Sequence, residues 1–266
     1  MKSSHIPFLL SLAGAPLASA GTTLWSGQFN ESYTVEDFDK WSWSNQIPPW
    51  QWYIHGSSPT STYLEVSPDF KNPNSTVSTE ETQGVRITID DTSSWNGQTM
   101  MRSELIPQIV SGTDLGSGVR VYHFSLSVGD DNFPNDGFEH QIAFFESHFT
   151  ELKYGGSSGT DTASSLSWYA SGTAQWSTPL ESGVWYNFAY AIDFSANTVA
   201  LYASTGGEDL ELVVDAVSAS TSTNSADWHV GVLRLDQANP GTGGAEDWFW
   251  SGVYVEEASA GVTLQV

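Results

Sequence analysis

The chain has 266 residues, of which 31 are acidic, 8 are basic and none is a cysteine, and its formal net charge is −23. Without cysteine it has neither a disulfide framework nor a thiol nucleophile or thiolate metal site. A surface this acidic repels nucleic acids, anionic membranes and uronic-acid polymers, so we expect a neutral or cationic partner and no binding to nucleic acid or membrane.

The N-terminal residues predict a secretory signal peptide over residues 1–20. Lys2 precedes the apolar stretch 6–17, and Ala18-Ser19-Ala20 has the small residues of a cleavage site. The apolar stretch is too short to cross about 30 Å of hydrocarbon. We therefore expect a secreted, extracellular protein whose residues 21–266 form one domain, a length at which all-β proteins still fold as a single domain.

Two sequons predict N-glycosylation at Asn30 and Asn74, in Asn30-Glu31-Ser32 and Asn74-Ser75-Thr76. They agree with passage through a glycosylating secretory route. A three-residue pattern also occurs often by chance, so the sequons support the secretory prediction without carrying it.

Tryptophan and tyrosine are unusually dense in residues 41–55, a stretch interrupted by Pro48-Pro49. These rings either fill the core or lie open as platforms for the apolar face of a sugar ring. We expect at least one ring to line a cleft. The candidates for substrate contact in this stretch are Trp50, Trp52, Tyr53 and His55.

Short alternating runs bounded by turn residues recur along the chain, and no long segment has helical periodicity. They predict strands at 84–90, 99–106, 119–128, 140–149, 185–194, 198–204, 228–235 and 248–256. Ser195-Ala196-Asn197 predicts a hairpin turn. This number of strands predicts an all-β fold, an antiparallel β-sandwich or jelly roll with a concave substrate-binding sheet.

Arg102 and Glu104 lie two residues apart in the predicted strand 99–106. Because side chains alternate across a strand, both face one side, and the apolar Met101 and Leu105 face the other. The pair is either a surface ion pair, which stabilises a protein by less than about 1 kcal/mol, or part of a polar groove.

The predicted strand 140–149 carries a second carboxylate. Alternation places His140, Glu146 and His148 on one side of it, among apolar residues. Glu146 is either a salt-bridged structural residue or a functional one, and the scarcity of basic residues favours the functional interpretation. The histidines either orient carboxylates or are structural, and the same choice holds for His229 in the predicted strand 228–235.

Two carboxylates on neighbouring strands are what glycoside hydrolysis requires, one to protonate the departing oxygen and one to activate water or attack the sugar. Glu104 and Glu146 are the candidate pair. Arg102 favours the ionised form of Glu104, which suits a base, and Phe144 favours the protonated form of Glu146, which suits an acid. A protonated His148 would oppose the second effect.

The chain resembles glycoside hydrolase family 131 from residue 21 onward. The matching segments are Trp95-Asn96-Gly97-Gln98, Arg102–Gln108, Glu139–Glu151, Asn187–Tyr190 and Ala226–Gly231. The resemblance implies a β-jelly roll and a fungal-type β-glucanase that acts on β-1,3-, β-1,6- and β-1,4-linked glucans with inversion at the anomeric carbon. It also places the two catalytic glutamates at Glu104 and Glu146. We expect a neutral β-glucan as the partner, a monomer, and no cofactor.

Two other functions compete with hydrolysis. A polysaccharide lyase of the alginate-lyase-like jelly roll shares the start of two motifs, but Ile106 stands where that family has a second arginine and Ala143 where it has a histidine. A lyase also needs cations to neutralise a uronate, which this chain lacks. A non-catalytic lectin explains the aromatic residues but leaves the glutamates and histidines without a role.

The loop with Asp130-Asp131-Asn132 and Asn135-Asp136 is rich in side-chain oxygens. Its spacing matches no complete calcium-binding loop. We therefore predict no metal site.

Overall fold

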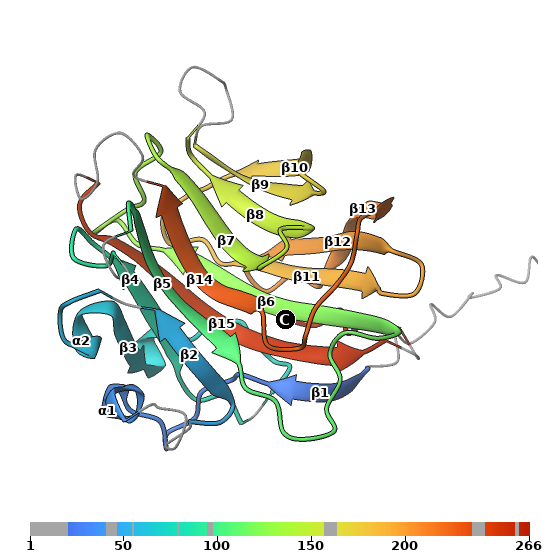
Figure 1. The fold of residues 1–266 in the computed structure, drawn as a ribbon, viewed down its shortest axis with the longest axis horizontal. Coiled ribbons are helices and arrows are strands. Elements are labelled where there is room, and N and C mark those ends of the chain that lie inside the picture. Colours follow the sequence, from blue (N-terminus) through green and yellow to red (C-terminus); the bar gives the residue numbers. More distant parts are fainter. Residues whose placement is uncertain are drawn as a thin grey trace, which may run out of the picture.

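The computed structural model describes residues 21–40, 47–54, 56–78, 80–94, 98–156, 164–235, 243–258 and 261–266, with the backbone alone for residues 52–54 (Figure 1). The predicted signal peptide, His55 and the side chains of Trp52 and Tyr53 lie outside the described residues.

Two antiparallel sheets stack into a β-sandwich (Figure 1). The first has the strand order β13-β12-β11-β6-β15-β4-β3, with β1 paired to β15, and the second has the order β10-β9-β8-β7-β14-β5-β2. The first sheet contains β1 (Thr22–Ser26), β3 (Leu64–Ser67), β4 (Gly84–Ile89), β6 (Val119–Val128), β11 (Tyr186–Asp193), β12 (Thr198–Thr205), β13 (Glu211–Ser218) and β15 (Glu246–Glu257). The second contains β2 (Trp50–Ile54), β5 (Met100–Pro107), β7 (Glu139–Phe145), β8 (Thr150–Tyr154), β9 (Ser165–Ala170), β10 (Thr173–Pro179) and β14 (Trp228–Leu235). The predicted antiparallel jelly roll is confirmed.

Helical structure is minor in the described residues. Helices α1 (Val35–Asp39) and α2 (Thr60–Tyr63) and the 3₁₀ helix η1 (Pro68–Phe70) all precede β4. Within the described ranges no helix has the length and apolar character needed to cross a membrane.

The predicted strands agree with the structure where the chain is regular. The predicted ranges 119–128 and 228–235 coincide with β6 and β14, and β11 and β12 form the predicted hairpin, with Asn197 at φ 55°. The predicted strand 140–149 is wrong, because β7 ends at Phe145 and β8 begins at Thr150. Between them the His148 N–H donates to the Phe145 carbonyl at 2.7 Å, which closes a turn.

Tryptophan rings fill much of the space between the sheets. Trp168, Trp228, Trp248 and Trp250 are all at most 1% exposed, and Trp228 packs edge-on against Tyr122 with ring centroids 5.0 Å apart. Large buried rings remove much apolar surface from water. The interior is therefore held by aromatic packing in a chain that has no disulfides.

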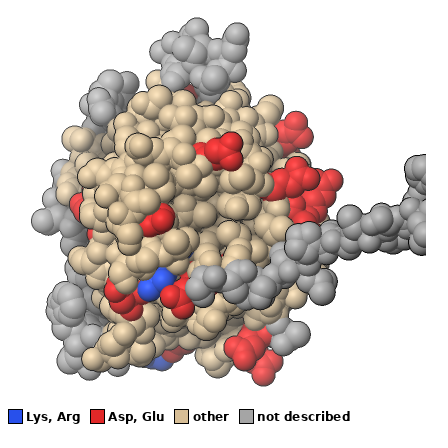
Figure 2. Space-filling view, turned by 90° about the vertical axis from the view of Figure 1, so that its right-hand side faces the viewer, with Lys and Arg blue, Asp and Glu red and all other residues tan. Residues whose placement is uncertain are grey.

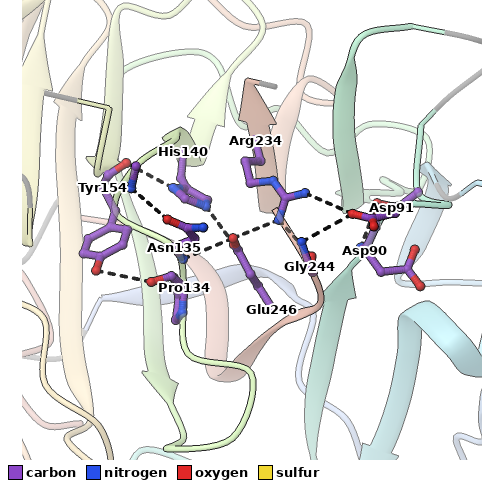
Figure 3. A network of polar contacts seen from close by, with 11 residues as sticks. Asp90, Asp91, Pro134, Asn135, His140, Tyr154, Arg234, Gly244 and Glu246 are labelled. Atoms are coloured by element: carbon purple, nitrogen blue, oxygen red, sulfur yellow. Dashed lines mark hydrogen bonds and ion pairs between the residues drawn. The ribbon is translucent and has the colours of Figure 1, made fainter. Parts of the chain in front are cut away.

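A buried ion-pair network joins β14, β7 and β15 (Figure 3). Arg234 Nη1 donates to Glu246 Oε1 at 2.9 Å, and His140 Nε2 contacts Glu246 Oε2 at 2.7 Å, with all three side chains fully buried. The Asn135 N–H also donates to Glu246 Oε1 at 3.1 Å. Burial raises the pKa of Glu246, but the charge and hydrogen bond of His140, followed by those of Arg234, outweigh burial and hold the pKa below its ordinary value.

We expect Glu246→Ala to lower the free energy of unfolding by about 3–5 kcal/mol, because it leaves two buried basic side chains without their shared carboxylate. Urea denaturation followed by tryptophan fluorescence measures this loss. The contribution of ionised Glu246 to the free energy of unfolding is fully present when the pH is above the ordinary carboxyl pKa. It disappears as the pH falls through the lowered pKa that Glu246 has in the folded protein.

The matched control is Glu65→Ala, which removes a partly exposed ion pair with Arg86 at 2.8 Å. It should reduce the free energy of unfolding by less than about 1 kcal/mol. Equal losses in Glu65→Ala and Glu246→Ala would contradict the stabilising role of the buried network.

Candidate active site

Strand β5 presents Arg102 and Glu104 on the face of the second sheet that points away from the core. Met101 and Leu105 pack into the core, so the predicted alternation is correct for this strand. Glu104 is 0% exposed, and Arg102 holds it with contacts of 2.6 Å from Nη2 and 3.2 Å from Nε to Oε2. Among the described residues nothing hydrogen-bonds the other carboxylate oxygen, Oε1, which is buried.

The neighbouring strand β14 brings His229 between the two glutamates. Its Nδ1 lies 2.9 Å from Glu104 Oε2, and its Nε2 lies 3.0 Å from Glu146 Oε2. The ring itself is nearly buried, with 6% of the side chain exposed. One imidazole therefore connects Glu104 and Glu146 through its two nitrogens.

A register shift between β7 and β14 orients the aromatic residue beside His229. Phe144 pairs with His229, but Ile142 pairs with Val232, so Ala143 opposes two residues of β14 and has φ 46°. Such an irregularity changes the direction of side chains. Phe144 stacks flat on the His229 ring with centroids 4.6 Å apart, while Ile142 packs in the core.

Gly231 allows β5 and β14 to approach closely beside the site. Its φ is 147°, and a Cβ atom there would lie 2.3 Å from the Ser103 carbonyl oxygen. No residue with a side chain fits this position without moving backbone. Gly231 is paired with Glu104 across the strands, so its small size sets the distance between Glu104 and His229.

The register shift also explains why one prediction is wrong. Alternation placed His140 on the same side as Glu146, but His140 points between the sheets, where it contacts Glu246 and packs near Trp248 at 5.9 Å. Before Ala143 the side chains of His140 and Ile142 point between the sheets. After Ala143 the alternation is reversed, so that Phe144 points to His229. His140 therefore belongs to the buried network and not to the site.

Glu146 lies in the turn after β7 and not in a strand. Its N–H donates to the Asp227 carbonyl at 3.0 Å, and 70% of its side chain is exposed. The expectation that Phe144 desolvates this carboxylate is therefore wrong. Glu146 is the accessible carboxylate of the pair, and Glu104 is the buried one.

His148 also stacks on Phe144. The ring centroids are 4.9 Å apart and the planes differ by 6°, so Phe144 makes parallel contacts with both His148 and His229. His148 Nδ1 contacts Glu151 Oε2 at 3.0 Å, and 41% of the side chain is exposed. Glu151 is not among the residues predicted from the sequence, although its spacing of three residues from His148 was an available signal.

The remaining predicted residues lie elsewhere. Trp50 is 1% exposed and packs edge-on against Trp25 at 4.9 Å, so its prediction as a sugar platform is wrong. Asn74 is exposed and Asn30 is partly exposed, and their glycosylation stays a prediction. The described residues contain no cluster of three or more histidine, aspartate or glutamate side chains suited to a metal.

The electrostatics of the bridge favour an ionised Glu104. Burial raises the pKa of Glu104, but the hydrogen bond and charge of His229, followed by Arg102, outweigh burial and hold the pKa below its ordinary value. An ionised Glu104 accepts a hydrogen bond from His229 Nδ1–H. His229 Nε2 is then the ring nitrogen that faces Glu146.

The chain matches one known family over most of its length. The model of the glycoside hydrolase 131 catalytic N-terminal domain matches residues 23–261. The chain belongs to glycoside hydrolase family 131. The lyase and lectin alternatives are therefore disfavoured, and the protein is a glycoside hydrolase that acts on polysaccharide.

Two solved structures of family 131 are similar over nearly the whole chain. The catalytic domain of the family 131 protein from Coprinopsis cinerea is 51% identical, with a TM-score of 0.83 over 92% of this chain and 98% of that chain. A family 131 beta-glucanase catalytic domain from Podospora anserina is 50% identical, with a TM-score of 0.83 over 92% of this chain and 99% of that chain. A comparison with curated protein sequences gives no match.

We expect Arg102→Met to raise the pKa of Glu104, because it removes an adjacent cation from a buried carboxylate. Carboxyl-selective NMR titration of the folded protein measures the change. His229 still holds Glu104 in this variant, so the carboxylate keeps part of its stabilisation. An unchanged or lower pKa would contradict the role of Arg102.

Proposed function

We propose that this protein is a secreted β-glucanase that hydrolyses β-1,3-, β-1,6- and β-1,4-linked glucans with inversion at the anomeric carbon. The observation that carries the proposal is the single imidazole of His229 between Glu104 and Glu146. The family 131 relative from Podospora anserina, described as a beta-glucanase, supports the substrate class. The net charge of −23 supports a neutral glucan over an anionic polymer.

The spacing of the two carboxylates supports inversion. Glu104 Oε2 and Glu146 Oε2 contact different nitrogens of one imidazole, at 2.9 Å and 3.0 Å, so the width of a ring separates these two oxygens. Inverting glycosidases hold their two carboxyl groups roughly 6.5–9.5 Å apart. This separation leaves room for a water molecule between the base and the sugar. A retaining enzyme needs its nucleophile within direct reach of the sugar, at roughly 5–5.5 Å from the acid.

We assign Glu146 as the general acid and Glu104 as the general base. Glu146 is accessible and can reach the oxygen of the departing sugar. Glu104 is held ionised, and its Oε1, which no described residue hydrogen-bonds, is the atom assigned to the attacking water. Because Oε1 is closed to solvent in this structure, substrate binding has to open a path for that water.

His229 completes the proton balance in this proposal. Each turnover leaves a proton on Glu104 and removes one from Glu146. His229 contacts both carboxylates, so its imidazole can return the proton from Glu104 to Glu146. The stack on Phe144 holds the ring in the orientation that this transfer requires.

We expect Glu104→Gln and Glu146→Gln each to lower laminarin hydrolysis by at least about 10²-fold, the scale of a positioned acid or base. Release of reducing sugar measures the activity, and circular dichroism shows whether the fold is kept. The matched control is Glu139→Gln on β7, whose carboxylate contacts Lys153 at 2.8 Å. Activity within a few-fold of wild type in either test variant would contradict the role of that residue.

A β-glucosyl fluoride oligomer distinguishes the two roles, because fluoride departs without a proton from the enzyme. We expect Glu146→Gln to keep substantial activity on this substrate and Glu104→Gln to lose it, since the water still needs a base. Fluoride release measured with an ion-selective electrode gives the result. The opposite pattern would mean that the assignment is reversed.

A further inference from the structure

A hollow opens at the edge of the sandwich where β10 of one sheet lies over β13 of the other. Its cavity volume is about 220 Å³, smaller than the roughly 300–1,000 Å³ of pockets that enclose a small molecule, so it can hold only part of a larger ligand. Strands β11 and β12 form its floor, and the end of β12 and the turn to β13 supply Thr205, Glu208 and Asp209 on its rim. Strands β10 and β13 end their sheets, so backbone on one side of each strand has no neighbouring strand.

An irregularity in β10 orients Trp176 at this hollow. The register with β9 shifts between Ala174 and Trp176, so Gln175 is an extra residue on β10. Such shifts at a sheet edge redirect the side chain that follows. Trp176 lines the hollow, packs edge-on against Phe188 at 5.9 Å and stays partly exposed, unlike the buried tryptophans between the sheets.

Apart from the indole of Trp176, the polar side chains that line the hollow carry hydroxyl or carboxylate oxygens. Hydroxyl groups and the carboxylates of Glu208, Asp209 and Glu211 surround the hollow, and no basic residue lines it. These three carboxylates make no ion pair or side-chain hydrogen bond with any described residue. The side of the molecule shown in Figure 2 is likewise rich in acidic and poor in basic side chains.

We propose that this hollow is a second, non-catalytic binding site for a neutral glucan chain. The indole of Trp176 offers an apolar ring face to a pyranose, and the carboxylates accept hydrogen bonds from its hydroxyl groups. An anionic sugar is repelled by the same carboxylates. The site is separate from the catalytic one, because β8 and β9 lie between β10 and β7. The identity of the ligand rests on the proposed β-glucanase function.

The test measures binding and catalysis separately. Affinity electrophoresis in gels that contain laminarin gives the retention of each variant, in a Glu146→Gln background so that the polymer is not cut. We expect Trp176→Ala to weaken retention about tenfold, the effect of losing a central aromatic contact. With Glu146 intact, Trp176→Ala should keep kcat/KM on a short β-glucan oligosaccharide within about twofold, because the two sites are far apart.

A second variant and a matched control keep the test independent of folding. Glu211→Ala changes only an exposed residue of β13 and should also weaken retention, while Asp215→Ala, an exposed acidic residue further along β13, should not. Unchanged retention in both Trp176→Ala and Glu211→Ala, with wild-type hydrolysis of laminarin, would overturn the second site and leave the proposed function standing. A second outcome would also overturn the second glucan site: retention of the protein by laminarin is abolished by added glucosamine oligosaccharide and not by added glucose oligosaccharide. The hollow would then bind an ammonium group. Absence of both hydrolysis and retention in the parent proteins would overturn the proposed function.

Discussion

The contact of one imidazole with two carboxylates is the constraint on which the site depends. His229 reaches Glu104 with one nitrogen and Glu146 with the other. Three strands have to meet for this contact: β5 supplies Glu104, β14 supplies His229, and the turn after β7 supplies Glu146. The close approach at Gly231 and the irregular register at Ala143 bring these residues into place.

Two arginines of this acidic chain each hold a buried glutamate. Arg102 holds Glu104, and Arg234 holds Glu246, and in both cases the carboxylate is completely buried. A buried carboxylate without a partner would be protonated or would destabilise the fold. These two arginines therefore help to keep Glu104 and Glu246 ionised inside the protein.

Much of the fold followed from the sequence, because alternation and turn residues are local signals. Strand β5 obeys period 2, so the shared face of Arg102 and Glu104 was predicted correctly. The shared face of His140 and Glu146 was not, because a register shift between two strands leaves no local pattern. Edge strand β13 was missed since most of its residues are exposed and it has no buried apolar face. The contact between His229 and the glutamates needs three distant segments and could not be read from spacing.

The anomeric form of the first product tests whether His229 spaces Glu104 and Glu146 for an inverting displacement, on which the proposed mechanism depends. Proton NMR recorded during the first minutes of laminarin hydrolysis distinguishes the α and β anomers before they equilibrate. We expect the α anomer to appear first from the β-linked polymer. Initial release of the β anomer would show retention and would contradict the proposed roles of the two glutamates.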